Sequence, residues 1–153
     1  FVQVEESVPC FVRPRGLGDV YESQVPAAHP AGPGVGTACK VLAIACRHSA
    51  DDVPFAVEDR LIDLSTVPEA ANADFAREPP GSWLLHHVPW TEAEHTISAV
   101  VADDRTAKAL AIAVGAPCLV IDRYTWRSAR TVTAVRLHYP GETHRLVARF
   151  KGG

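Results

Sequence analysis

Two segments of this chain, residues 40–63 and 118–139, share one pattern: an apolar run rich in β-forming residues, a short polar turn and a second such run. This pattern is typical of β-hairpins. The four expected strands are Lys40–His48, Pro54–Asp63, Cys118–Trp126 and Thr131–Tyr139, with turns at Ser49–Asp52 and Arg127–Arg130. We therefore expect an α+β fold, with an antiparallel sheet and flanking helices.

The two hairpins can be aligned with each other as an internal repeat. Residues 41–48 match 118–125, and residues 54–58 match 132–136, so that Glu58 and Arg136 take corresponding positions. This alignment predicts that the acid and the base face one shared cavity. The alternative is a structural ion pair or exposure to solvent, which is the usual state of charged strand residues.

Further elements are predicted around the hairpins. Alternating polarity over Glu92–Val101 predicts a strand, and another is expected at His144–Phe150. Three helices are expected: one capped by Ser65 or Thr66 and running to about Phe75, a short one at Trp83–His87 capped by Ser82, and one capped by Asp103 or Asp104 and ended by Gly115 and Pro117. Residues 7–36 are rich in Pro and Gly and are interpreted as a linker.

Composition limits the class of protein. A chain of 153 residues suits one domain, and a formal charge of −3 argues against a nucleic-acid-binding surface on this piece. There is no Met, so the chain is expected to start inside a longer gene product. The four cysteines form no C-x-x-C pair. Without a visible signal peptide or membrane span, a cytoplasmic protein with reduced thiols is expected.

Four motifs occur in order along the second part of the chain: V-P-F-A-V-E-D-R-L-I-D (53–63), E-A-E-H-T-I-S-A-V (92–100), P-C-L-V-I-D-R-Y-T-W (117–126) and A-V-R-L-H-Y-P-G (134–141). They resemble the effector-binding UTRA domain of bacterial repressors in the HutC branch of the GntR family, over roughly residues 37–150. The family usually has Asn at the position of Asp63 and His at that of Tyr139. The resemblance implies the chorismate-lyase-like fold.

The resemblance also implies organisation and function. Residues 1–36 would be the lead-in from a missing N-terminal winged-helix DNA-binding domain, and residues 37–153 the UTRA domain. The domain would sense a small carboxylate effector such as urocanate, form a homodimer, and regulate histidine utilisation. Operator DNA would be bound only through the missing domain, and neither a cofactor nor a membrane partner is expected.

Seven residues are candidates for effector binding: His48, Glu58, Arg60, Ser82, Glu94, Arg123 and Arg136. Arginine offers the two-pronged geometry that a carboxylate accepts, and a helix start at Ser82 would present free N–H groups to an anion. Glu94 and His95 lie on opposite faces of a strand, so at most one should reach the pocket. The alternatives are a plain cap for Ser82, a surface turn residue for His48 and a sheet-bracing role for Arg123.

Catalytic and metal-binding signatures are missing from the sequence. It has no G-x-S-x-G, P-loop, G-x-G-x-x-G or H-E-x-x-H motif, and its adjacent histidines point apart on a helix. We therefore expect a non-enzymatic sensor without a metal. Two alternatives remain: an enzyme similar to chorismate lyase, which would hold its substrate with Arg and Glu, and a dimerisation module with a degenerate pocket.

Overall fold

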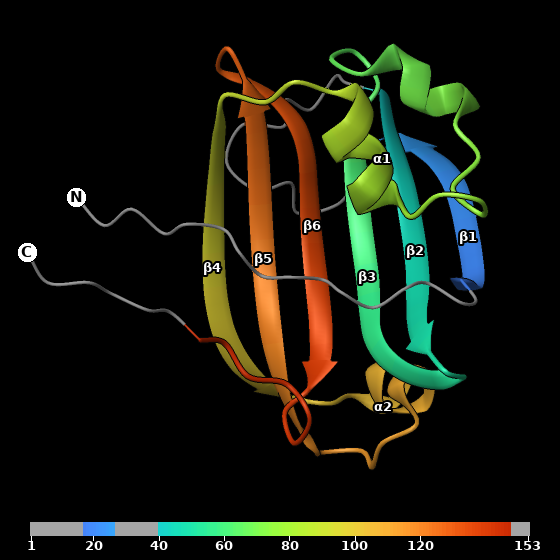
Figure 1. Cartoon of the computed structure of the whole chain (residues 1–153), viewed down its shortest axis with the longest axis vertical. Helices are drawn as coiled ribbons and strands as arrows, with labels where there is room; N and C mark the ends of the chain where they lie inside the picture. Colours follow the sequence, from blue (N-terminus) through green and yellow to red (C-terminus); the bar gives the residue numbers. More distant parts are fainter. Residues whose placement is uncertain (1–16, 27–39, 148–153) are drawn as a thin grey trace, which may run out of the picture.

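Six strands form one antiparallel sheet in a computed structural model, which describes residues 17–26 and 40–147 (Figure 1). The strands are β1 (Leu17–Pro26), β2 (Lys40–Ala50), β3 (Val53–Asp63), β4 (Glu92–Val101), β5 (Pro117–Arg127) and β6 (Arg130–Pro140), in the spatial order β1-β2-β3-β6-β5-β4. The hairpins β2–β3 and β5–β6 are joined side by side through β3 and β6. The predicted α+β class, both hairpins and β4 are confirmed.

The two hairpins share their turn and their irregularity. Asp51 and Asp52 in one turn, and Ser128 and Ala129 in the other, all have positive φ, as two-residue turns matched to strand twist require. Each hairpin then skips one residue on its second strand: Ser49 pairs with Pro54 and His48 with Ala56, whereas Trp126 pairs with Thr131 and Thr125 with Thr133. Phe55 and Val132 are therefore equivalent β-bulge positions.

The internal repeat is therefore real, but the alignment predicted from sequence is one residue out of step on the second strand. Glu58 pairs with Cys46, and the equivalent pair in the other hairpin is Val135 with Arg123. The structural counterpart of Glu58 is thus Val135 and not Arg136. A shift of one residue moves a strand side chain to the opposite face of the sheet.

Three helical segments flank the sheet. They are a 3-10 helix (Pro68–Asn72), α1 (Pro80–His87) and α2 (Asp104–Leu110). The first is much shorter than the predicted helix. Helix α1 begins at Pro80, since proline suits a first helical turn, so the predicted cap Ser82 lies inside the helix. Asp103 caps α2 as predicted, but the helix ends before Ala111, which adopts a left-handed φ of 55°, and not at Gly115.

The ends of the described chain differ from prediction. Leu17–Pro26 belongs to the predicted lead-in, yet it pairs along β2 as a strand at the sheet edge. The interpretation of residues 17–26 as part of a linker is therefore wrong, because these residues are held in the sheet by backbone pairing with β2. The other parts of the lead-in, 1–16 and 27–36, lie outside the described residues. Residues 144–147 are not a strand, and 148–150 are not described.

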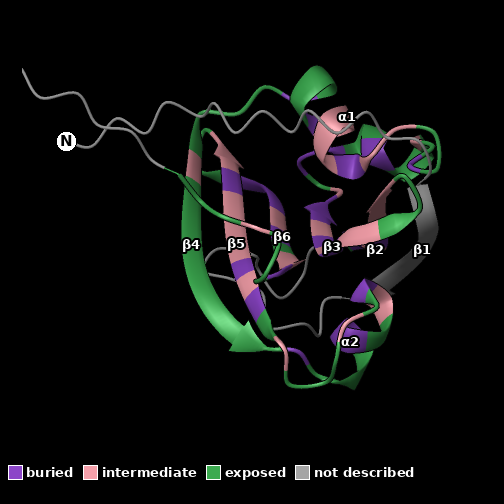
Figure 2. Cartoon of the chain, turned by 60° about the horizontal axis from the view of Figure 1, so that its bottom comes forward, coloured by how far each residue is buried: buried purple, intermediate pink, exposed green. Residues whose placement is uncertain are grey.

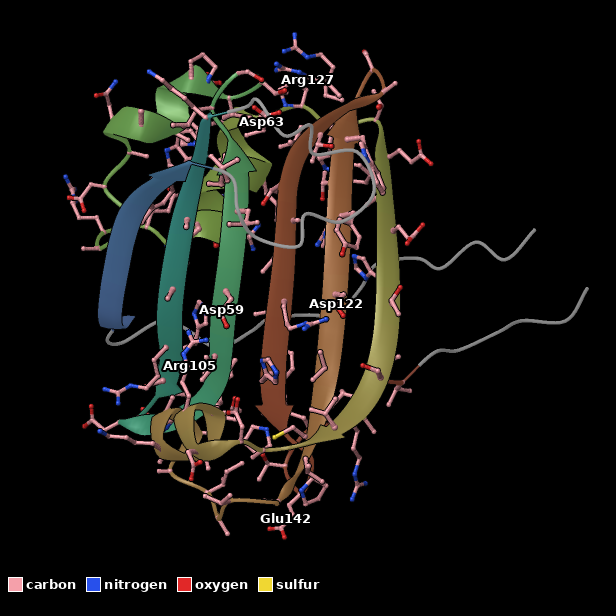
Figure 3. All side chains as sticks on the ribbon, turned by 180° about the vertical axis from the view of Figure 1, so that it is seen from behind. Asp59, Asp63, Arg105, Asp122, Arg127 and Glu142 are labelled. Carbon is pink, nitrogen blue, oxygen red and sulfur yellow. The ribbon has the colours of Figure 1, made fainter. Side chains whose placement is uncertain are left out.

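The helices pack on opposite faces of the sheet. The front face carries α1 and the segment before it, and the back face carries α2 at one end (Figures 1 and 3). The main core lies on the front face, where Phe75, Leu84 and Val88 pack against residues of β2 and β3 such as Ile44 and Ile62. A smaller core lies under α2 and contains Val57, Leu110 and Cys118. Cys46 and Cys118 are both buried, one in each core.

Strand β4 is an edge strand with little cover. All of its residues except Ala93 are exposed, and Figure 2 shows it almost entirely in the colour of exposed residues. No helix in the described ranges, 17–26 and 40–147, has the length and apolarity needed to cross a bilayer.

Candidate functional site

A buried ionic cluster lies on the front face of β3. Glu58 and Arg60 are two residues apart on the strand, so both side chains point to the same face. The Nε of Arg60 donates to Oε1 of Glu58 at 2.5 Å, and Nε2 of His48 lies 2.8 Å from Oε2. Only 3% of Glu58 and 7% of Arg60 is exposed. The carboxylate is thus held between two nitrogen groups.

The electrostatics keep Glu58 charged. Burial by itself would raise the pKa of this carboxyl group, but the positive charge of Arg60 and the hydrogen bond and charge of His48 outweigh it. The net effect lowers the pKa of Glu58 to about 2. Glu58 is therefore a permanent counter-charge for Arg60 near neutral pH, and it is not a group that exchanges protons there.

The rest of the Arg60 guanidinium is held in a fixed orientation. Its Nη1 donates to Oγ1 of Thr133 on β6 at 3.2 Å, and that hydroxyl donates to the carbonyl of Leu61 at 2.8 Å. Its Nη2 lies 3.4 Å from the point where a Cβ on Gly81 would sit, at the start of α1. Within the described residues, Nη2 has no hydrogen-bond acceptor. One arm of a buried, oriented arginine is therefore available.

A small cavity of about 90 Å³ lies between α1 and the front face, and Arg60 and Gly81 are part of its wall. Its polar lining comes from Arg60, Arg123 and two threonine hydroxyls, and its apolar lining comes from α1, the segment after it and β6. The complete lining is Arg60, Gly81, Leu84, Leu85, Val88, Trp90, Arg123, Thr125, Val132 and Thr133. Such a mixture of apolar walls and few polar groups is typical of small-molecule sites.

Five of the seven predicted residues lie at or near this cavity. Arg60 and Arg123 line it, and Glu58 and His48 lie behind Arg60 in the ionic cluster. Ser82 follows the lining residue Gly81 in the first turn of α1 and is half-buried. It therefore lies in the first turn of the helix beside the cavity, and the N-cap position belongs to Pro79.

Arg136 and Glu94 are not brought to this cavity. Arg136 pairs across the sheet with Asp59 and Asp122, on the back face, and its guanidinium makes two hydrogen bonds to Asp122 at 2.7 and 3.0 Å. Figure 3 shows Asp59 and Asp122 on this face, away from α1. The prediction that Glu58 and Arg136 face one shared cavity is therefore wrong.

Strand register also places Glu94 on the back face. It pairs with Tyr124, whereas its neighbour His95 pairs with Arg123 on the front face. Directly paired residues project to the same side of a sheet. The two side chains lie on opposite faces of β4, and the residue on the front face is His95, not the predicted Glu94.

Several cavity residues were not predicted from sequence. Leu84 in α1 and Val88 directly after it are apolar and are predicted to be core residues from sequence. Thr125 and Thr133 pair with each other across β5 and β6, a relation that only the strand register reveals. Gly81 could have been found from the Pro-Pro-Gly sequence, and Trp90 had no signal beyond its aromatic ring.

The described residues include no group of three or more His, Cys, Asp or Glu side chains arranged to hold a metal ion. The cavity lining is instead suited to a negatively charged group. It contains two arginines, two hydroxyl groups and the first turn of a helix, whose N–H groups favour negative charge.

Comparison with known proteins identifies similar sequences. The UTRA domain family matches residues 21–145. The histidine utilization repressors of Pseudomonas aeruginosa and Klebsiella aerogenes are 41% and 36% identical to this chain over 103 residues, which is 67% of the chain. The matched region is 41% and 43% of those two proteins, so the chain spans about two fifths of the length of these curated relatives.

Solved structures show the same arrangement of strands and helices. The C-terminal domain of a histidine utilization repressor from Pseudomonas syringae pv. tomato is similar with a TM-score of 0.77 and 31% identity, covering 90% of this chain and 97% of that chain. The effector domain of PhnF from Mycobacterium smegmatis has a TM-score of 0.74 at 16% identity and covers 89% of this chain and 85% of that chain. The second likeness concerns the fold alone.

Proposed function

Because this chain belongs to the UTRA domain family, we propose that it is the effector-sensing part of a transcriptional repressor and that the cavity under α1 holds the effector. The names of its relatives are those of repressors, which favours a sensor over an enzyme. The observation that carries the proposal is the available Nη2 of Arg60, which is buried, oriented by Glu58 and Thr133, and part of the cavity wall.

The effector we propose is a small carboxylate. The available Nη2 of Arg60 can donate a charge-assisted hydrogen bond to a carboxylate oxygen, and the low local dielectric of a buried site strengthens such a bond. Arg60 already carries Glu58 as counter-charge, and Arg123 in the same wall adds a second positive group. A cavity of about 90 Å³ favours a molecule smaller than the usual drug-sized ligand.

Urocanate is the specific effector that we propose. It has one carboxylate and a flat imidazole ring, which match the cationic and apolar parts of the lining. Relatives named histidine utilization repressor support a role in regulating histidine utilisation. Binding would alter the spacing or orientation of DNA-binding domains that lie outside this chain, so that the ligand shifts an equilibrium between two arrangements of the whole protein.

The whole repressor is proposed to be a homodimer, with β4 as part of the interface. The strand is an edge of the sheet, so one side of its backbone has no partner strand among the described residues. It also exposes the large apolar side chains Ile97, Val100 and Val101. An exposed apolar edge is a template for pairing with a second strand, and oligomers of one chain are mostly symmetric dimers.

Calorimetric titration of the domain with urocanate, histidine and acetate tests the proposed function. We expect urocanate to bind with a one-to-one stoichiometry and acetate to bind far more weakly. Arg60→Lys keeps the charge beside Glu58 but lacks the Nη2 donor that faces the cavity, so it should weaken urocanate binding at least tenfold while the domain stays folded.

Arg136→Lys is the matched control, because it is the same substitution on the back face of the neighbouring strand. It should leave the affinity unchanged within about twofold. If the wild-type domain binds none of the carboxylates near neutral pH, or if Arg60→Lys and Arg136→Lys behave alike, the assignment of the cavity to an anionic effector is wrong.

A further inference from the structure

Trp90 occupies an unusual position among the aromatic residues. It lines the cavity under α1, and 43% of the residue is exposed. Trp83 packs edge-to-face with Phe75 and stacks on His87, and Trp126 stacks on Tyr124. Within residues 40–147, no aromatic ring contact and no hydrogen bond involves the Trp90 side chain. The Trp90 ring therefore lines the cavity without an aromatic partner among the described residues.

The backbone around Trp90 is held in place. The next residue, Thr91, donates its N–H to the carbonyl of Trp126 at 2.8 Å, and its hydroxyl donates to the same carbonyl at 3.3 Å. On the other side, Val88 is buried and its N–H bonds to the carbonyl of Leu84 at the end of α1. The segment that carries Trp90 is thus tied both to the helix above the cavity and to the end of β5.

The cavity lining combines cationic, hydroxyl and aromatic side chains. Arg60 and Thr133 lie on β3 and β6, whereas Trp90 is tied to the end of β5, which is the next strand in the sheet. The second arginine, Arg123, lies on β5, so the two arginines of the lining lie on the two strands that flank β6. A ligand whose carboxylate meets Arg60 would place its remaining atoms toward Trp90, Leu85 and Val88.

We propose that Trp90 is a specificity-determining residue, which stacks on a flat, unsaturated ring attached to the carboxylate of the effector. The inference rests on the proposed function, because it assumes that the carboxylate lies at Arg60. Indole faces prefer offset or edge contacts with other flat π-systems, and such contacts add to the area that they bury. An aliphatic acid would gain only burial, so Trp90 selects among carboxylates by ring shape.

The experiment is a comparison of ligands and variants by calorimetry. The ligands are urocanate, which has the ring, and crotonate, which keeps the unsaturated carboxylate without the ring and is measured by competition. We expect Trp90→Leu to weaken urocanate three- to tenfold and crotonate less than twofold, and Trp90→Phe to retain most of the urocanate affinity. Trp126→Leu is the control, because Trp126 stacks on Tyr124 and does not line the cavity.

The outcomes separate the two proposals. If the domain binds urocanate in an Arg60-dependent manner but Trp90→Leu weakens both ligands equally or neither, the role of Trp90 is wrong and the proposed function stands. If the wild-type domain binds neither ligand, the proposed function fails, and the role of Trp90 fails with it. A selective loss of urocanate binding in Trp90→Leu, absent in Trp126→Leu, supports both.

Discussion

Glu58 holds a full negative charge in a buried position, and this charge orients the arginine of the cavity. The carboxylate contacts Arg60 and His48, and its pKa is lowered to about 2 although burial alone would raise it. Removing one partner of a buried ion pair leaves an uncompensated charge, which is far more costly than losing an exposed pair. In the proposed site, Glu58 would therefore act on effector binding through the position of Arg60.

The pH dependence of stability follows from this residue. Because the folded protein binds the Glu58 proton more weakly than the unfolded chain does, its stabilising contribution is fully present above pH 4.5 and is lost as pH falls toward 2. Above pH 4.5, Glu58→Gln should lower the free energy of unfolding by about 3 kcal/mol. Urea unfolding of both proteins from pH 6 to pH 2 measures the difference.

The difference between wild type and Glu58→Gln should shrink toward zero near pH 2. A constant difference over this range would mean that the cost of the substitution arises from packing and not from charge. Asp122→Asn is a suitable control, because the Asp122–Arg136 pair is partly exposed and such pairs contribute little.

Arg136 lies in an exposed ion pair, in contrast to the buried pair of Glu58 and Arg60. Its side chain is 58% exposed and bonds Asp122 on the back face, so the neutral substitution Arg136→Gln removes an exposed ion pair and nothing from the cavity. Urocanate affinity should stay within about twofold of wild type and stability should fall by about 1 kcal/mol or less. Calorimetry and urea unfolding measure these quantities, and a loss of binding would contradict the placement of the effector on the front face.

The turn of the β5–β6 hairpin contains an alanine in a backbone conformation that alanine does not favour. Its turn residue Ala129 has a φ of 64°, a conformation that glycine adopts without the steric cost of a Cβ. The equivalent turn of the β2–β3 hairpin uses two aspartates, which tolerate this conformation better than alanine. The turn geometry is imposed by the twist of the strands that it joins.

Ala129→Gly should therefore stabilise the domain by about 0.5–1 kcal/mol, measured as an increase in the free energy of unfolding in urea. Ala113→Gly is the matched control, because Ala113 is exposed but has no positive φ, so that glycine there only adds freedom to the unfolded chain. Equal effects of the two substitutions would contradict the argument from backbone strain.

At the scale of the whole molecule, the sheet has an exposed edge that a second copy can extend. Ile97, Val100 and Val101 lie on β4 and are 44%, 40% and 71% exposed. A domain with this edge should dimerise through it, and the dimer would continue the sheet across the symmetry axis. This surface is separate from the cavity under α1, which lies over β3, β6 and β5.

Ile97→Lys should weaken the dimer at least tenfold, because it places a charge on the apolar part of the edge. Light scattering during size-exclusion chromatography, over a range of protein concentrations, gives the molar mass of the eluted domain and so distinguishes monomer from dimer. Val114→Lys is the control, since Val114 is 63% exposed and lies in the loop after α2. A wild-type domain that stays monomeric at every concentration, or equal behaviour of the two variants, would contradict the interface.

The chain itself determined the elements whose signals are local. Alternating polarity located β4 at Glu92–Val101, the two apolar pairs of strands located the hairpins, and Asp103 marked the start of α2. The order of motifs also identified the UTRA family, which the family match confirms. These elements could be predicted because each depends only on residues close together in the sequence. Alternation sets the two faces of a strand, turn residues set the turn conformation, and a capping side chain binds the free N–H groups at a helix start.

Only the tertiary structure decided which charged residues meet. The equivalent β-bulges at Phe55 and Val132 set the register, and that register places Glu58 and Arg60 on the front face and Arg136 on the back. The packing of α1 on the sheet then encloses Arg60, Gly81 and Trp90 around one cavity. Sequence alone could not reveal this arrangement, because a shift of one residue reverses every side chain of a strand and contacts between distant segments leave no local pattern.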